Sequence, residues 1–328
     1  MSATKFIIES KNHDIKVLTY NVSWESLESS KSLKLDMSHC ALNNKSNECS
    51  DNIAQIICQY GINLITNTNT NTNTNTNTNT NTNTNTNTNT NTNKYIYDFI
   101  CLQEIINTKN QWKYLENKIN QLEPDFLSNY NIEYTEDLPA GIISLYNKNY
   151  YHLIYKFQGQ LSNHDHRPWQ ILVFKEKIIL INVHFPHLTY FQEDSLYIIK
   201  TNIEKIKNLL NLENLLDWKI IFCGDFNNQD PTQLQNFPFI FQSLNMQLYK
   251  EPKKLITCCV PHDFSTYNKS SDHIYSSFAQ ASLYETMDDK KYFIKGGLRI
   301  MSDHLPVFAI FPIDNDNFIK KYYINYLK

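Results

Sequence analysis

The sequence predicts an α/β protein in which mixed β-sheets are faced by a few helices. Hydrophobic residues make up 41% of the 328 residues, which is enough for a sizeable core and excludes a wholly disordered chain. Predicted strands outnumber predicted helices, and short turns join many of the strands. A regular alternation of strand and helix, which would build a purely parallel sheet, does not fit this order.

The first elements surround a low-complexity repeat. Residues 15–22 alternate and are rich in β-branched side chains, which predicts a strand. A polar loop is expected at 23–51, and apolar residues at helical spacing predict a short helix at 53–60. The Thr-Asn dipeptide repeat at 66–93 cannot bury apolar surface, so we expect a disordered insertion between this helix and the next strand.

The remaining elements follow from apolar runs and helical spacing. A strand is expected at 97–102 and a helix at 112–122. Short turns predict two pairs of neighbouring strands, 141–146 with 151–157 and 170–174 with 178–183. The longest predicted helix covers 194–217, with Asp194 or Ser195 as its N-terminal cap. Beyond it we expect strands at 219–223, 272–276 and 305–311 and a short helix at 237–244.

The charge balance limits the class of partner. The net charge is −3 and the isoelectric point is about 6.4, so the chain lacks the strongly basic character of a protein that coats nucleic acid. A phosphate-bearing substrate remains compatible, because a bound divalent metal would supply the missing positive charge.

Cysteine usage and hydropathy predict the compartment. The seven cysteines are odd in number and form no CxxC pair, so neither a disulfide framework nor a zinc site is expected. The N-terminus lacks the apolar core of a signal peptide, and no stretch approaches the ~18 apolar residues of a membrane span. We therefore predict an intracellular protein, cytoplasmic or nuclear, and we predict no protein partner.

Polar clusters stand at the ends of predicted strands. They are Tyr-Asn at Asn21, Leu-Gln-Glu at Glu104, Asn-Val-His at His184, Gly-Asp-Phe-Asn at Asp225 and Asn227, Asp-His-Ile-Tyr at Asp272, and Ser-Asp-His-Leu-Pro at Asp303 and His304. Taken singly, each is more often a turn residue or a cap. Taken together, carboxylates, carboxamides and imidazoles suit metal-assisted phosphoryl hydrolysis. Mg²⁺, with Mn²⁺ as an alternative, prefers oxygen ligands, and an imidazole oriented by a carboxylate provides a base.

This order of motifs resembles the endonuclease/exonuclease/phosphatase superfamily, which includes deoxyribonuclease I. The resemblance covers roughly 15–311, with the repeat as an insertion. It implies a four-layer α-β-β-α sandwich, in which two mixed β-sheets pack face to face with helices outside. It also implies one domain at 15–312, flanked by an N-terminal extension at 1–14 and a C-terminal tail at 313–328.

The resemblance also implies roles for single residues. The metal ligands would be Asn21, Glu104 and Asp303. Asp225 would position or deprotonate the attacking water, and Asp272 would orient His304, as base or as transition-state stabiliser. The phosphate-binding groups would be Asn227, His184 and Arg167, although Arg167 is equally well read as a surface residue. Asn227 and His184 would also be catalytic, with His184 assisting the leaving group.

The sequence departs from the family pattern in two places. Some members carry an acidic residue near the metal where this chain has Ser23. A carboxylate partner for His184 is not evident, and Glu133 and Glu136 are only weak candidates. Because Ser23 replaces an acid that those members use near the metal, metal binding is expected to be weaker or differently arranged than in them.

The predicted function is a Mg²⁺-dependent phosphoesterase. A phosphodiesterase or nuclease acting on nucleic acid by in-line attack of water is favoured, because of the Arg167 match and the lack of lipid-specific features. One alternative is a phosphatase or phosphodiesterase acting on inositol phosphates, phospholipids or another small phosphoester. An alternative of another class is a catalytically inactive binding module, against which the complete set of motifs argues.

Overall fold

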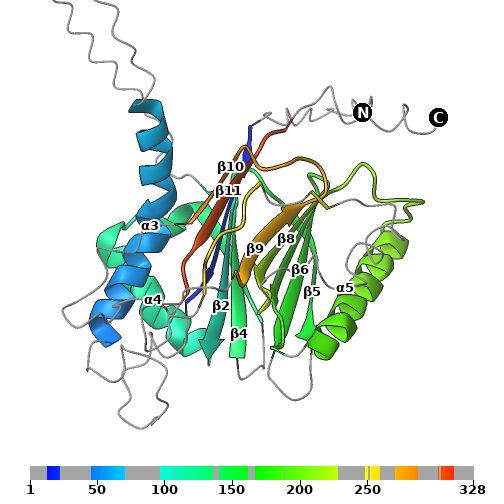
Figure 1. Cartoon of the computed structure of the whole chain (residues 1–328), viewed down its shortest axis with the longest axis horizontal. Helices are drawn as coiled ribbons and strands as arrows, with labels where there is room; N and C mark the ends of the chain where they lie inside the picture. Colours follow the sequence, from blue (N-terminus) through cyan, green and yellow to red (C-terminus); the bar gives the residue numbers. More distant parts are fainter. Residues whose placement is uncertain are drawn as a thin grey trace, which may run out of the picture.

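Two β-sheets form the centre of the molecule (Figure 1). The computed structural model describes residues 13–22, 46–70, 97–106, 108–135, 140–161, 167–187, 189–227, 248–249, 252–258, 270–286, 302 and 304–313. The predicted helix at 237–244 lies outside these residues, as do the chain termini and most of the repeat.

The first sheet has six strands in the order β10-β11-β1-β2-β4-β3. Its strands β1 and β2 run parallel and its other neighbours run antiparallel, so the sheet is mixed. Its members are β1 (Ile15–Asn21), β2 (Phe99–Ile106), β3 (Tyr130–Tyr134), β4 (Ala140–Asn147), β10 (Leu283–Thr286) and β11 (Val307–Phe311).

The second sheet has five strands in the order β5-β6-β7-β8-β9, with β7 and β8 parallel. Every residue of the central strands β6 and β7 and of the edge strand β9 is buried, as is every residue of β8 except Lys219. Its members are β5 (Leu153–Gln160), β6 (Pro168–Phe174), β7 (Ile178–His184), β8 (Lys219–Asp225) and β9 (Asp272–Ser276).

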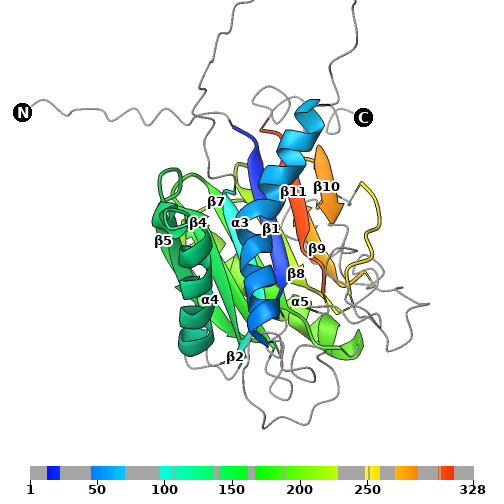
Figure 2. The same ribbon diagram turned by 90° about the vertical axis from the view of Figure 1, so that its left-hand side faces the viewer.

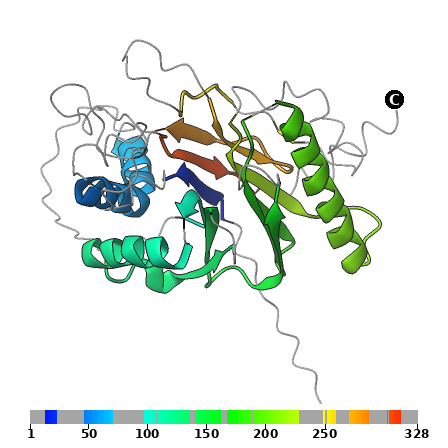
Figure 3. The same ribbon diagram turned by 90° about the horizontal axis from the view of Figure 1, so that it is seen from below.

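Helices cover the outer faces of the two sheets (Figures 2 and 3). Helices α3 (Ser46–Thr70) and α4 (Thr108–Leu122) lie on the six-stranded sheet, followed by a short 3-10 turn, η1 (Leu127–Asn129), and α5 (Thr189–Leu209) lies on the five-stranded sheet. A third apolar cluster fills the space between the sheets. These layers confirm the predicted four-layer sandwich.

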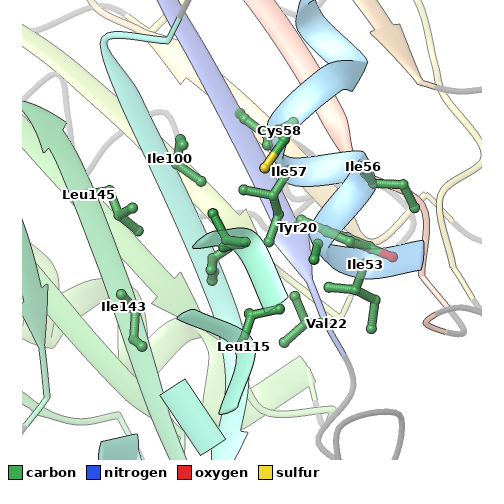
Figure 4. Close-up of a cluster of buried hydrophobic side chains, with 14 of the residues drawn as sticks. Tyr20, Val22, Ile53, Ile56, Ile57, Cys58, Ile100, Leu115, Ile143 and Leu145 are labelled. Atoms are coloured by element: carbon green, nitrogen blue, oxygen red, sulfur yellow. The ribbon is translucent and has the colours of Figure 1, made fainter. Parts of the chain in front are cut away.

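The contact of α3 with its sheet shows how the outer layer is held (Figure 4). Ile53, Ile56 and Ile57 recur at three- and four-residue steps, so they share one face of the helix. They pack with Tyr20 and Val22 of the β1 segment in one buried cluster. Burying such side chains is the main favourable contribution to this layer.

One predicted strand pairing is wrong. Strands β4 and β5 do not pair with each other, because β4 lies between β2 and β3 and β5 pairs only with β6. Tyr151, in the connection, is buried against Phe99, with ring centroids 4.6 Å apart, and donates a hydrogen bond to Asp98 over 2.9 Å. Tyr151 is thus held against the six-stranded sheet, and the chain continues from it into β5 of the five-stranded sheet. The turn residues at 147–149 do not show that the two strands belong to different sheets. The predicted pair at 170–174 and 178–183 is confirmed as β6 and β7.

The predicted helix bounds also differ from those of the structure: α4 begins at Thr108 rather than at 112, and α3 and α5 differ at both ends. Helix α3 is much longer than the expected 53–60 and extends to Thr70, into the start of the repeat, where we expected disorder. Once a helix has nucleated, each further residue adds a hydrogen bond, so it can propagate into polar sequence. Helix α5 begins at Thr189, so Asp194 and Ser195 lie inside it and are not its cap. It ends at Leu209 rather than at the predicted 217, and Asn211, just beyond it, has a φ of 51°, the left-handed conformation that favours helix termination.

Strands β3 and β10 were not predicted. Both are short, lie at the edges of the six-stranded sheet and contain half-buried residues, so their sequences lack a clear apolar pattern.

The cysteines differ in their oxidation state. Cys58, Cys101 and Cys223 are free thiols, whereas Cys49 and Cys258 are disulfide-bonded, although the sequence predicted no disulfide framework. An odd number of cysteines leaves one unpaired but does not prevent the others from forming disulfides. No helix among the described residues has the length and apolar character needed to cross a membrane.

Candidate active site

Strand topology brings the predicted polar clusters to one edge of the sandwich. Parallel strands end at the same edge, so Asn21 on β1 stands beside Gln103 on β2, and His184 on β7 stands beside Asp225 on β8. The antiparallel strand β9 begins there, which places Asp272 opposite Asp225. Residues from positions 21 to 304 thus meet within hydrogen-bonding distance.

Asn21 joins the two sheets at this edge. Its buried amide nitrogen donates to Glu104 Oε1 over 3.1 Å and to Asp225 Oδ2 over 2.8 Å. Two carboxylates from different sheets are therefore held by one carboxamide. The nitrogen faces these carboxylates, so the arrangement shows Asn21 as a donor that orients them, and its role as a metal ligand stays a prediction.

Glu104 reaches the site because its strand is irregular. The pairing of β2 with β4 shifts register between Leu102 and Ile105, which marks a β-bulge, and Glu104 has a φ of 60°. In a regular strand its side chain would point to the opposite face from that of Gln103. The bulge re-aims the carboxylate, as bulges beside active sites commonly do, and Glu104 Oε1 lies 3.4 Å from His184 Nε2.

A glycine allows β8 to present Asp225. Gly224 has a φ of 139°, and a Cβ atom added there would lie 2.0 Å from the carbonyl oxygen of Val183 on β7. Only glycine fits this approach, which explains the first residue of the Gly-Asp-Phe-Asn motif. The last residue, Asn227, adopts a φ of 50°, donates its backbone N–H to Asp225 Oδ1 over 2.8 Å, and donates its side-chain amide to the Phe185 carbonyl over 2.7 Å.

Asp272 and His304 form a buried pair. His304 Nδ1 lies 2.8 Å from Asp272 Oδ2, the contact that the resemblance implied. The other ring nitrogen, Nε2, lies 3.7 Å from Asp225 Oδ2. The ring is therefore held between two carboxylates, one at each nitrogen.

Side chains that sequence reasoning missed support this pair. Thr257 Oγ1 accepts the backbone N–H groups of Ser271 and Asp272, and Ser302 Oγ donates to the Asn21 carbonyl over 2.6 Å. Cys258 Sγ lies 3.3 Å from His304 Nε2. Ser302 stands in the Ser-Asp-His motif, which was a usable signal, whereas nothing in the sequence around Thr257 and Cys258 marked them.

His184 is buried beside a cation and two carboxylates. Its ring contacts the Arg167 guanidinium, and its Nε2 lies 3.5 Å from Asp225 Oδ2. Burial, and then the Arg167 charge, hold the pKa of His184 well below its usual value, so the ring is neutral at pH 7. Of the two weak candidates for a partner of His184, Glu133 pairs with Lys156 over 3.1 Å instead, and Glu136 lies outside the described residues.

The surroundings of Asp225 shift its pKa in opposite directions. Burial raises its pKa, and the nearby Asp272 carboxylate acts in the same direction. His304, the Asn227 N–H and the Asn21 amide oppose the shift. The net direction is upward, which moves this carboxyl toward the range in which a general base or acid operates.

The donor atoms are compatible with a divalent cation. Glu104, His184 and Asp225 each offer one ligand atom, and these atoms lie within 4.8 Å of one another; Asp225, Asp272 and His304 form a second such group. The two carboxylates of the first group suit Mg²⁺ or Mn²⁺, which prefer oxygen ligands. Asp303, the third predicted ligand, lies outside the described residues.

Comparison by sequence finds one distant relative. No protein-family model matches the chain. An uncharacterised protein of Acanthamoeba polyphaga mimivirus is 27% identical over 227 residues, which cover 65% of this chain and 40% of the relative. The chain thus matches less than half the length of that relative.

Solved structures of other proteins have the same arrangement of sheets and helices. A Bacteroides vulgatus endonuclease/exonuclease/phosphatase is 16% identical with a TM-score of 0.54, covering 92% of this chain and 100% of its own. Truncated Caenorhabditis elegans TDP2 has a TM-score of 0.55 at 14% identity, covering 93% and 100% of the two chains. TDP2 of D. rerio, solved with a single-strand DNA product, has a TM-score of 0.52 at 15% identity, covering 92% and 99%. The chain has the endonuclease/exonuclease/phosphatase fold, as the motifs predicted.

Proposed function

We propose that the chain is a metal-dependent phosphodiesterase that hydrolyses phosphoester bonds in nucleic acid. The convergence of Glu104, Asp225 and His304 at one edge of the sandwich carries this proposal. A bound divalent metal, Mg²⁺ or Mn²⁺, would supply Lewis-acid charge at the phosphate and would be held by Glu104, with Asn21 and Asp303 as further ligands.

The chain's own groups divide the remaining work. Asp225, whose pKa is raised, would orient the attacking water and accept its proton. His304, fixed by Asp272 through Nδ1, would face the reacting phosphate with Nε2 and stabilise its charge. Neutral His184 and the Arg167 cation stand together on the β6–β7 side, and Asn227 follows Asp225, so these three residues would bind the phosphate oxygens.

One comparison favours nucleic acid as the substrate: a TDP2 with this fold was solved with a single-strand DNA product. Arg167 is half-buried and its guanidinium contacts the His184 ring, which places a cation beside the proposed phosphate site and suits any phosphoester. Inositol phosphates, phospholipids and other small phosphoesters remain the alternative substrates, and a catalytically inactive binding module remains the alternative of another class.

A substrate panel tests the proposal. It contains single- and double-stranded DNA, RNA, inositol phosphates and sphingomyelin, each incubated with Mg²⁺, with Mn²⁺ and with EDTA. We expect metal-dependent cleavage of nucleic acid, reduced about 10²-fold or more in Asp225→Asn because a proton-transfer group is lost. Asp217→Asn is the matched control, since Asp217 lies just before the opposite end of β8 with its side chain 80% exposed.

The outcomes separate the alternatives. Metal-dependent release of phosphate from the small substrates alone would favour the phosphatase. Metal-independent rates, or equal rates in Asp225→Asn and wild type, would refute the role of the site. Tight binding of nucleic acid without turnover would favour the binding module.

A further inference from the structure

Directly beneath the candidate active site lies a second buried polar layer. In a strand, residues two apart point to the same face. Thr19 therefore lies one step below Asn21 on β1, and Asn182 lies one step below His184 on β7. Gln103 of β2 stands beside Asn21 and immediately before Glu104. Thr19, Gln103 and Asn182 are all fully buried.

These side chains connect the two sheets through hydrogen bonds. Gln103 Nε2 donates to Asn182 Oδ1 over 2.8 Å and to Thr19 Oγ1 over 3.0 Å. Asn182 Nδ2 donates to the Ile143 carbonyl and to Ser144 Oγ, both over 3.1 Å. The network therefore ties β7 of one sheet to β1, β2 and β4 of the other.

Donor and acceptor chemistry fixes the orientation of both amides. The Ile143 carbonyl only accepts, so the Asn182 nitrogen must face it and the Asn182 oxygen must face Gln103. Gln103 must in turn present its nitrogen to Asn182. The two carboxamides thus have one consistent arrangement, and a carboxylate at either position would break it because a carboxylate has no N–H to donate.

The network holds the residue that precedes the strained bulge. Glu104 has a φ of 60°, a conformation that costs a residue other than glycine about 1–3 kcal/mol and persists only where its surroundings enforce it. The side chain of the adjacent Gln103 is fixed by three acceptors: Thr19, Asn182 and the Cys101 carbonyl. Without these bonds β2 is free to relax toward a regular strand, in which the Glu104 side chain would leave the site.

We propose that Gln103 and Asn182 form a carboxamide clamp that positions Glu104 for the divalent cation. This inference rests on the proposed function, because it concerns the same metal site. Gln103 and Asn182 are positioning residues: they touch neither the cation nor the substrate, and they act through the backbone at Glu104 and His184.

The test measures Mn²⁺ affinity directly, by counting free Mn²⁺ with electron paramagnetic resonance. Gln103→Met and Asn182→Leu should each weaken Mn²⁺ binding by roughly 10–100-fold, the effect typical of removing a partner that orients a metal ligand. The double variant should be little weaker than the worse single variant, because both changes break the same contact. The Mg²⁺ concentration for half-maximal hydrolysis should rise in parallel.

A matched control is available in the same layer. Gln170 on β6 stands beside Asn182, is fully buried, and has no hydrogen-bond partner for either amide atom within the part of the chain that the structure describes. Gln170→Met should keep Mn²⁺ affinity within about 2-fold, since no oriented partner is lost. If Gln103→Met fails to fold, Thr19→Val replaces it, because this near-isosteric change removes one acceptor of Gln103 and should shift affinity in the same direction by a few-fold.

The results distinguish this proposal from the proposed function. Unchanged Mn²⁺ affinity in the clamp variants, with only the urea unfolding midpoint lowered, would show a purely structural role and overturn the clamp. A wild-type protein that binds no Mn²⁺ would overturn it as well. A wild type that binds Mn²⁺ but hydrolyses no phosphoester would refute the proposed function, while the affinities would still decide the clamp.

Discussion

Gly224→Ala is the sharpest test of how the site is assembled. The added Cβ would lie 2.0 Å from the Val183 carbonyl oxygen, where ordinary contacts begin at 3.4 Å. Strands β7 and β8 must therefore separate by about 1.4 Å at this point, or the backbone must leave its φ of 139°. Either movement displaces Asp225 relative to His184, because each directly follows one of the two clashing residues.

Two magnitudes follow from this geometry. Stability should fall by about 3 kcal/mol or more, since backbone strain and a clash with a main-chain atom add together. Turnover of any phosphoester substrate should fall about 10²-fold, the loss expected when reacting groups move by about 1 Å. Urea unfolding followed by circular dichroism measures the first quantity, and initial rates at saturating metal measure the second.

Gly159→Ala provides the control for this prediction. Its added Cβ would lie 3.0 Å from the Trp169 side chain rather than from a backbone atom, so a small side-chain shift relieves it. We expect a clearly smaller loss of stability and near-normal turnover. Gly224→Ala that unfolds and turns over like wild type would refute the close approach of β7 to β8 at the site.

Two further predictions concern the imidazoles. Asp272→Asn and His304→Gln should each lower turnover about 10²-fold, and the double variant should be little worse, because the two groups act as one pair; additive losses in the rate measurements would refute the pairing. The pKa of His184 is held well below the unfolded value of 6.5 in the folded protein. The unfolded chain therefore binds a proton more readily as the pH falls, so the stability that neutral His184 contributes at pH 7.5 should be lost at lower pH. Urea unfolding in EDTA should therefore show a lower free energy of unfolding at pH 5.5 than at pH 7.5, and His184→Gln should reduce this difference. An unchanged pH slope in the variant would contradict the burial of the neutral ring.

Strand positions followed from local sequence patterns, whereas the pairing of strands and the contacts between distant segments did not. Strands such as β6, β7 and β8 were found because burial on both faces gives local apolar runs, and β1 was found from its alternation and β-branched residues. The wrong pairing of β4 with β5 arose because pairing depends on where Tyr151 is buried, far from the turn itself. Likewise, Cys258 near His304 comes from an isolated bridge between distant segments, which no local pattern encodes.

The sequence by itself determined which chemical groups are available and in what order they follow the strands, because motif identity and strand alternation are local properties. Only the tertiary structure decided that Glu104 turns into the site through a bulge, that Arg167 and two carboxylates surround His184, and that a layer of carboxamides lies beneath them. Several of these features depend on contacts between residues about 80 or more positions apart in the sequence. The free energy of such contacts depends on how the two sheets pack and not on any one segment.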